Sequence, residues 1–208
     1  MGRWEPNARG RLARAALVLS AEKGYDATTV AEIAAAAGVT ERTFYRYFAD
    51  KADAIFPDNT GLLVRLSAVV TDAVDAGHNP LDAALTAVQE LAMYASQEPE
   101  RTRLNAQVIP AVPALAGREL LRQRQIADAV SQALSHSGVP ALDAQLAAET
   151  ALGVWRVAVA EWARDAQKGA LTDVVASTAD AARSQTSRVR LRSPTTSSDV
   201  AEARPAGQ

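Results

Sequence analysis

The feature that most constrains this fold is a series of helix start and stop signals near the N-terminus. Thr29 is followed three residues later by Glu32, the capping-box pattern that begins a helix. Gly38 ends that helix after about two turns, and Thr40 is positioned to cap another helix over residues 41–48. Two short helices joined by a few residues that include a glycine form a helix-turn-helix. The sequence therefore predicts this motif near the N-terminus.

The segments on either side of this motif also predict helices. The first, over residues 7–23, has apolar residues at helical spacing and Gly24 at its end; these residues are Leu12, Ala15, Ala16 and Leu19. Another helix begins after Asp50 and must end or kink within two turns, because Pro57 cannot continue it.

The remainder predicts a larger helical body. Alanine, the best helix former, occupies 46 of the 208 positions, which favours an all-α protein. Pro110 and Pro113 predict a break between the second and third helices of the body. Short loops favour antiparallel neighbours. The expected helices cover residues 61–76, 80–97, 117–135, 142–167 and 171–185.

These elements divide the chain into three parts. Residues 1–56 are expected to form the helix-turn-helix domain and residues 57–187 a second, larger helical domain. Residues 188–208 are rich in Ser, Thr, Pro and Arg and have no aromatic residue, so we expect a disordered tail.

The helix over residues 41–48 has two different faces. Phe44 and Phe48 share one side, whereas Arg42 and Arg46 lie about 160° away at 100° per residue, next to Thr43. An α-helix fits the DNA major groove, where arginine binds guanine and a threonine methyl meets thymine. Arg42, Thr43 and Arg46 are therefore the candidate base contacts. The alternative is an ordinary solvated helix face.

Phosphate contacts require donors at the rim of such a surface. The candidates carry hydroxyl or ammonium groups: Thr28, Thr29, Tyr45, Tyr47 and Lys51. Tyr45 and Tyr47 are equally compatible with packing. Arg3, Arg9 and Arg11 are expected to add attraction that does not depend on sequence.

The charge distribution agrees with this placement. The whole chain has a net charge of -2, but residues 1–51 carry eight Lys or Arg and six Asp or Glu. Residues 52–182 carry nine Lys or Arg and sixteen Asp or Glu. A polyanion should therefore meet the N-terminal part.

The segment TTVAEIAAAAGVTERTFYRYFADKADAIF, residues 28–56, resembles the DNA-binding domain of the TetR family of one-component repressors. The resemblance implies a DNA-binding domain over residues 1–56 and a ligand-binding and dimerisation domain over residues 57–187. It further implies an all-α homodimer that binds a near-palindromic operator and releases it when a small molecule binds. It also implies that Thr40, Arg42, Thr43, Tyr45, Arg46 and Tyr47 lie on or beside the recognition helix, with Lys51 on the DNA backbone. The segments VIPAVPALAGRELLRQRQ and WRVAVAEW resemble an actinobacterial subgroup that includes regulators associated with mycofactocin clusters, some of which respond to acyl-CoA-type ligands.

Several residues of the body are candidates for a ligand pocket. They are aromatic, methionine or arginine side chains: Met93, Tyr94, Arg118, Arg122 and Trp155. Met93, Tyr94 and Trp155 suit an acyl chain. An arginine suits an anionic head group such as that of a fatty acid or acyl-CoA. Core or dimer packing and a solvated face are the alternatives.

For the dimer we expect the last two helices to pack against their copies. Their apolar residues exceed what one small body should need: Leu146, Leu152, Val159, Leu171, Val174 and Val175.

Other function classes have less support. The chain lacks the GxxxxGK[ST], GxGxxG, GxSxG and HExxH motifs, so we expect no enzyme and no cofactor. With no cysteine and two histidines, His78 and His136, we expect no metal site. No apolar run approaches the roughly 18 residues of a membrane span, and we expect a cytoplasmic protein. A helical enzyme and a DNA-binding architectural protein without a ligand remain alternatives.

Overall fold

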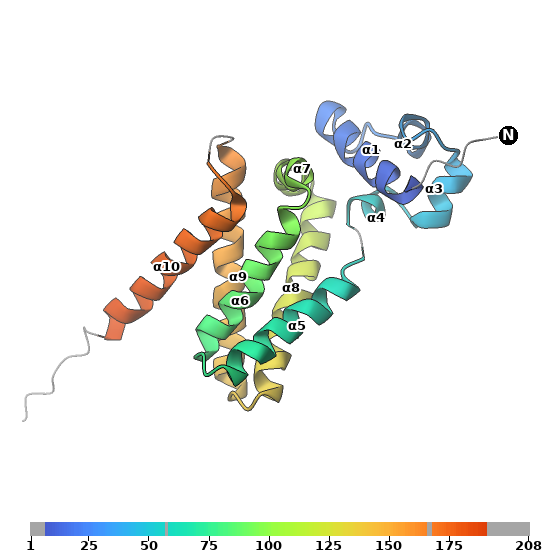
Figure 1. The fold of residues 1–208 in the computed structure, drawn as a ribbon. Helices are drawn as coiled ribbons and strands as arrows, with labels where there is room; N and C mark the ends of the chain where they lie inside the picture. The colour runs from blue at the N-terminus through green and yellow to red at the C-terminus, as the bar shows by residue number, and fades with distance from the viewer. Residues whose placement is uncertain (1–6, 57, 166–167, 191–208) are drawn as a thin grey trace, which may run out of the picture.

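The computed structural model describes residues 7–56, 58–165 and 168–190. Within these ranges the chain forms ten α-helices and no strand, so the expected all-α class is confirmed (Figure 1). We call the first four helices the head: α1 Ala8–Lys23, α2 Val30–Ala36, α3 Glu41–Tyr47 and α4 Lys51–Ile55. The other six form the body: α5 Thr60–Asp75, α6 Pro80–Ala95, α7 Pro99–Ala111, α8 Pro113–His136, α9 Ala141–Arg164 and α10 Leu171–Arg190.

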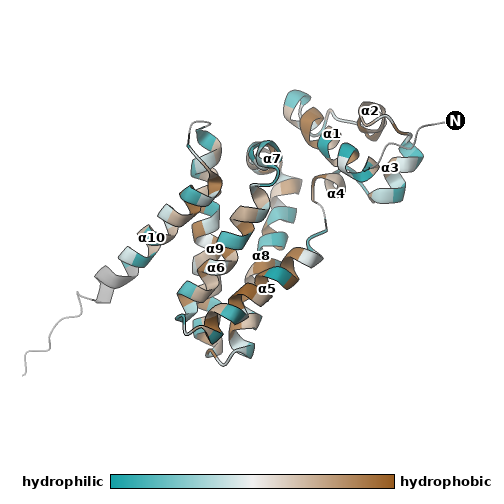
Figure 2. Ribbon diagram, in the orientation of Figure 1, coloured by the Kyte–Doolittle hydropathy of each residue, from teal (hydrophilic) through white to brown (hydrophobic). Residues whose placement is uncertain are grey.

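The body is a helical bundle. Helices α5, α6, α8 and α9 lie side by side, and α10 packs on α9 and α6 before it extends away from the head (Figure 1). Hydrophobic residues form bands along the bundle helices (Figure 2). Many of the buried residues are alanines, including Ala144, Ala148, Ala151 and Ala158 of α9. Small side chains at these positions let neighbouring helices approach closely.

The body differs from the sequence prediction at α7, which was not expected. Pro99 begins this helix, where its missing N–H is not needed, and Pro110 is tolerated one residue before the end. Pro113 then begins α8, four residues before the predicted start. These prolines start and end helices, whereas Pro110 and Pro113 were expected only to break the chain between two helices.

The C-terminal boundary also differs from the prediction. Helix α10 continues to Arg190, so residues 188–190 are helical where a tail was expected. Residues 191–208 and Pro57 lie outside the described residues, so the predicted tail and the predicted proline break are not tested there. Helix α4 ends at Ile55, before that proline.

One hydrophobic cluster joins the head to the body. It includes Leu12, Ile33 and Phe44 of the head together with Ile109 of α7 and Leu115 of α8. Helix α7 packs directly on α1. The core of the head is therefore completed by the body.

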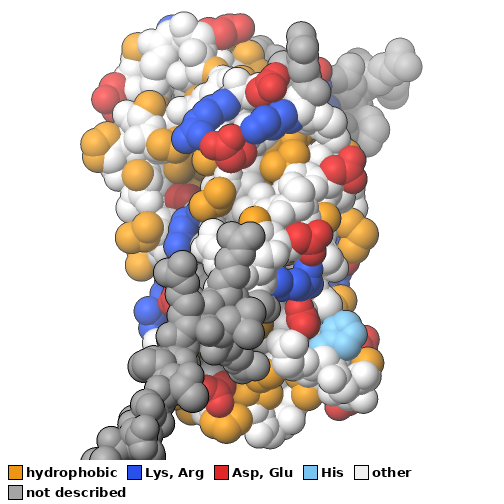
Figure 3. All heavy atoms as spheres, turned by 90° about the vertical axis from the view of Figure 1, so that its left-hand side faces the viewer, with side chains coloured by type: hydrophobic (Ala, Val, Ile, Leu, Met, Phe, Trp, Pro, Cys, Tyr) orange, Lys and Arg blue, Asp and Glu red, His pale blue; other side chains and the backbone are white. Residues whose placement is uncertain are grey.

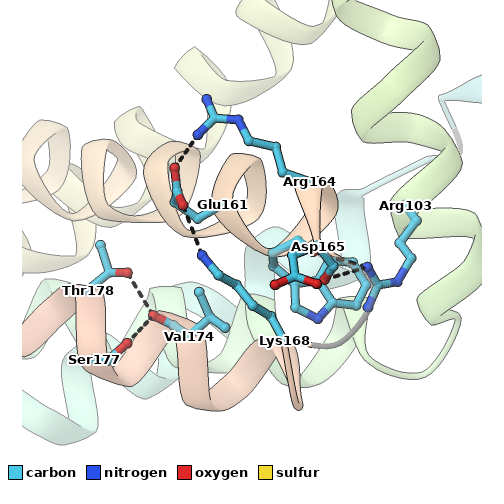
Figure 4. Close-up of polar contacts among 9 residues, drawn as sticks. Arg103, Glu161, Arg164, Asp165, Lys168, Val174, Ser177 and Thr178 are labelled. Carbon is cyan, nitrogen blue, oxygen red and sulfur yellow. Dashed lines mark hydrogen bonds and ion pairs between the residues drawn. The ribbon is translucent and has the colours of Figure 1, made fainter.

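The opposite side of α7 is attached to the end of α9. Arg103 lies 3.9 Å from the centre of the Trp162 ring and donates hydrogen bonds to the carbonyls of Trp162, at 3.0 Å, and Asp165, at 3.4 Å (Figure 4). A cation is favourable at a helix C-terminus, where carbonyls lack partners within the helix. Trp162 also donates to the carbonyl of Gly169 at 3.2 Å, which holds the connection to α10. Helix α7 thus lies between the head and α9.

Among the described residues, no helix is both long and apolar enough to cross a membrane.

Candidate nucleic-acid interface and ligand cavity

The start of α2 is fixed by the predicted capping box. The Thr29 hydroxyl accepts a hydrogen bond from the backbone N–H of Glu32 at 3.2 Å, and the Glu32 carboxylate accepts one from the Thr29 N–H at 2.9 Å. Lys23, at the end of α1, forms an ion pair with the same carboxylate. The hydrogen bond from Lys23, followed by those from Thr29, lowers the pKa of Glu32 from 4.5 to about 2.

The turn between α2 and α3 is a Schellman motif. The N–H of Gly38 donates to the carbonyl of Ala35, and the N–H of Val39 donates to that of Ala34. Gly38 has φ 66, which favours glycine at this position. Val39 packs partly into the cluster of the head.

Helix α3 has the two faces that its sequence predicts. Phe44 is fully buried and Phe48 nearly so, whereas Arg42 and Arg46 are exposed. Thr40 caps the helix and accepts a hydrogen bond from the N–H of Thr43 at 3.3 Å. The buried phenylalanines hold one side of the helix against the head, so the arginine side faces solvent.

The other residues predicted to lie beside α3 occupy different environments. Tyr45 is 58% exposed and packs edge-on against Phe44. Tyr47 is half-buried in the head cluster, and the Arg46 guanidinium lies 4.9 Å from its ring centre and donates to its hydroxyl. Thr43 is half-buried beside Thr40, at 3.2 Å between the hydroxyls. Tyr45, Arg42 and Arg46 are thus exposed on α3, whereas Thr43 and Tyr47 are half-buried.

Two predicted phosphate contacts, Thr28 and Lys51, form hydrogen bonds within the head. Thr28 is 1% exposed, and its hydroxyl donates to the carbonyl of Gly24 at 2.9 Å, so its side chain is not on the surface, contrary to the prediction. The Lys51 ammonium donates to the carbonyls of Tyr25 and Thr28, and it lies 4.2 Å from the Tyr25 ring centre. Lys51 therefore connects α4 to the loop before α2, which sequence spacing did not indicate. These two hydrogen bonds use two of the three N–H donors of the ammonium group, which leaves the third for another acceptor.

Arg9 and Arg11 of α1 also contact other residues of the head. Arg11 Nε donates to the carbonyl of Ala37 at 3.0 Å, at the end of α2. The Arg9 guanidinium lies 5.6 Å from the Phe48 ring centre. Arg3 lies outside the described residues.

A cavity of about 330 Å³ lies in the body on the side of the head. It is lined by residues of α6, α7, α8 and α9 and by the end of α4, and it opens to solvent. Of the five predicted ligand residues, Tyr94, Arg122 and Trp155 line it. The apolar part of the wall also includes Ile55, Phe56, Leu91, Ile109 and Val159, and the polar part includes Arg101, Asn105, Glu119, Gln123 and Arg156.

The other two predicted ligand residues, Met93 and Arg118, do not line this cavity. Met93 is 52% exposed on α6. Its neighbour Tyr94 lines the cavity and Met93 does not, because successive residues of a helix face different directions. Arg118 instead forms a bidentate ion pair with Asp50, at 2.6 and 3.3 Å. Asp50 caps α4, so this pair joins α8 of the body to the head.

The Asp50 carboxylate is stabilised in its charged form. Burial raises its pKa, but the hydrogen bonds from the Asp53 N–H and from Arg118 outweigh burial and bring the pKa below its usual value. The ion pair is therefore maintained at neutral pH.

Comparisons with known proteins agree with this geometry. Residues 12–55 match the model of a family described as bacterial regulatory proteins, tetR family. These residues therefore form an N-terminal domain of the TetR type. The matched residues run from the middle of α1 to the end of α4, which is the head.

A curated relative also matches part of the chain. It is the HTH-type transcriptional repressor KstR2 of Mycobacterium tuberculosis, 39% identical over 74 residues. The match covers 36% of this chain and 37% of that repressor. The relative therefore provides information on little more than a third of either protein.

Solved structures share the fold over most of the chain. The fatty acid degradation regulator FadR of Bacillus halodurans has a TM-score of 0.61 at 19% identity, covering 87% of this chain and 96% of that one. FadR of Bacillus subtilis in complex with stearoyl-CoA has a TM-score of 0.55 at 18% identity, covering 83% and 96%. At these identities the likeness shows a common fold: a helix-turn-helix head on a helical body.

The capping box predicts a pH dependence of stability. The pKa of Glu32 is lower in the folded protein, about 2 against 4.5, so its stabilising effect is complete above pH 4.5 and is lost as the pH falls toward 2. Glu32→Gln keeps an acceptor for the Thr29 N–H but carries no charge. We expect urea unfolding to show a smaller loss of stability in this variant than in the wild type over that range. Equal losses would contradict the assignment.

Proposed function

We propose that this protein is a homodimeric transcriptional repressor that binds operator DNA and releases it when a small molecule occupies the cavity of the body. The observation that carries the DNA-binding part is α3: its phenylalanine side is buried and its arginine side faces solvent within a TetR-family head. Its N-terminus is capped by Thr40, and the preceding turn is a Schellman motif, so the helix is rigidly presented.

In this proposal α3 enters the major groove. Arg42 and Arg46 donate to the acceptors of guanine, and Thr43 contacts a base edge with its methyl group. Tyr45, Tyr47, Thr40 and the remaining N–H of Lys51 supply hydrogen bonds to the flanking phosphates. Thr29 is left out of this set, because its hydroxyl and its backbone N–H both donate to the Glu32 carboxylate. Phosphate contacts fix position, and the arginine contacts select sequence.

The ligand part of the proposal rests on the cavity. A body without a cavity would favour an architectural DNA-binding protein, whereas this one has a space within the size range of small-molecule sites, about 300–1,000 Å³. Tyr94 and Trp155 offer aromatic surface, and Arg122 offers a cation for an anionic group. The complex of FadR with stearoyl-CoA supports amphipathic acyl compounds as the first class to test.

The route from cavity to DNA is short. Ile55 and Phe56, at the end of α4, are part of the cavity wall. Arg118 holds the N-terminal cap of the same helix from α8, which also contributes Arg122 to the cavity. A ligand that shifts α8 against α4 therefore changes the orientation of the head. It weakens DNA binding only to the extent that it prefers the shifted state.

The dimer part of the proposal needs a different argument from the one the sequence provided. Leu152, Leu171 and Val175 are buried within the chain, and Val159 and Val174 pack on the same core, so they are not surplus. Leu146 is 57% exposed, and Leu142 and Val157 of α9 are exposed as well. Figure 3 views the side of the body that carries α10, where hydrophobic side chains lie exposed between charged ones. We place the dimer contact on the exposed faces of α9 and α10.

The first prediction of this proposal concerns the DNA sequence that α3 selects. Arg42→Ala or Arg46→Ala should cost about 1–3 kcal/mol per half-site and relax the preference at particular base pairs, because each removes a base contact. Lys51→Ala should weaken all sequences alike, through a lost phosphate contact and a less rigid head. Arg124→Ala, on the body, is the control. Fluorescence anisotropy with a set of operator variants measures both effects. A change of preference in Lys51→Ala alone would refute the assignment of faces.

The second prediction concerns the link between cavity and head. A coupling of about 1–3 kcal/mol changes DNA affinity roughly 5- to 150-fold, and operator DNA must weaken the ligand by the same factor. Asp50→Asn retains a capping oxygen for α4 but removes the charge that Arg118 binds. We expect this variant to bind acyl ligands as the wild type does while the reciprocal effect becomes smaller.

Calorimetric titration of fatty acids and stearoyl-CoA, with and without operator, measures this coupling. Arg124→Gln on α8 is the matched control. Equal ligand affinity in both wild-type titrations would exclude the mechanism, and an unchanged coupling in Asp50→Asn would exclude the ion pair from it.

The third prediction concerns the dimer. Leu146→Glu should dissociate it, because it introduces a charge into a buried apolar contact. Leu121→Glu, at an exposed leucine of α8, should leave it intact. Sedimentation velocity at micromolar concentration distinguishes the two. A monomeric wild type would refute the dimer. Twofold symmetry also requires operator half-sites about one helical turn, or a multiple of it, apart.

A further inference from the structure

Two polar atoms in the wall of the cavity are buried without a hydrogen-bond partner. They are Oδ1 of Asn105, on α7, and Nε of Arg122, on α8. Among the described residues only two other side-chain atoms, of Asn59 and Ser96, are in this condition, and neither residue lines the cavity. Buried polar groups in proteins are almost always paired, so an unpaired one facing a cavity indicates a missing partner.

Neighbouring polar groups of the same wall are paired within the protein. The Thr102 hydroxyl donates to the carbonyl of Ala95 at 2.9 Å. Glu119 accepts a hydrogen bond from Gln123 at 2.8 Å. Arg122 Nε lies 3.4 Å from the Glu119 carboxylate, close enough for charge attraction but without a hydrogen bond. The two unpaired atoms are therefore specific features of the wall.

Their chemistry defines complementary ligand groups. Asn105 Oδ1 accepts and therefore requires a donor, whereas Arg122 Nε donates and requires an acceptor, preferably an anion. A saturated acyl chain has no donor for Asn105. A cavity of about 330 Å³ is near the lower limit for small-molecule sites, which favours a compact ligand. We infer that the ligand is a hydroxylated carboxylic acid, with its hydroxyl donating to Asn105 and its carboxylate accepting from Arg122.

This inference rests on the proposed function only in placing the ligand in the same cavity. Its first consequence concerns the ligand-free protein. Asn105→Leu replaces the amide oxygen and nitrogen by two methyl groups of similar size. Because it removes the unpaired oxygen, it should raise the melting temperature. Thr102→Val, which removes a paired hydroxyl from the same helix, should lower it. A decrease in Asn105→Leu equal to that in Thr102→Val would mean that Asn105 is paired within the protein, and would overturn the inference.

The second experiment tests recognition of the hydroxyl. Decanoic acid and its monohydroxylated isomers are titrated calorimetrically into the wild type, Asn105→Leu and Thr102→Val. In the wild type and in Thr102→Val, at least one hydroxylated isomer should bind about tenfold or more tightly than decanoic acid. In Asn105→Leu this preference should disappear. Arg122→Gln, titrated separately with the same acids, should bind the plain and hydroxylated acids more weakly than the wild type does, and by the same factor.

The inference fails if the wild type shows no preference, if the preference persists in Asn105→Leu, or if none of the acids binds. Operator binding by the same three proteins is measured separately. Loss of the ligand result with intact operator binding refutes only the ligand class, whereas absence of operator binding by the wild type refutes the proposed function.

Discussion

The hydrophobic cluster shared by head and body is the interaction on which the rest of the structure depends. Helices α2, α3 and α4 have seven, seven and five residues, too few to be stable alone. They persist because Ile33, Phe44 and Ile55 are buried against α1, and because Ile109 and Leu115 of the body close the same cluster. The direction of α3 is consequently set by the body as well as by the head.

The sequence predicted those parts of the head that depend on local contacts. The capping box of Thr29, the turn at Gly38 and the cap of Thr40 each involve residues at most a few positions apart, and all three are present. The two faces of α3 follow from helical periodicity alone. The unexpected helix α7 has the opposite character: six of its thirteen residues are polar or charged, and its buried residues are Val108 and Ile109, so hydrophobic periodicity gives little signal.

The parts of the site that the sequence did not predict depend on contacts between distant residues. Lys51 binds a carbonyl 26 positions away, and Thr28 is buried beneath it. On α8, Arg118 and Arg122 have the same chemistry and are separated by one turn, yet one contacts the head and the other lines the cavity. Which leucines and valines of α9 and α10 the core uses also depends on packing, and that is why Leu152 and Leu171 were misjudged.

The positions of Arg118 and Arg122 provide a path by which the ligand of the proposed function would act on the head. A helix transmits displacement along its axis because its backbone hydrogen bonds resist local change. In the proposed function, a ligand anion that displaces Arg122 also displaces the adjacent turn of α8, from which Arg118 holds Asp50. Asp50 caps α4, and Ile55 at the other end of α4 lines the cavity, so both ends of this short helix would respond to occupancy. Because Lys51 ties α4 to the loop that begins α2, the displacement passes to the helix-turn-helix as a unit.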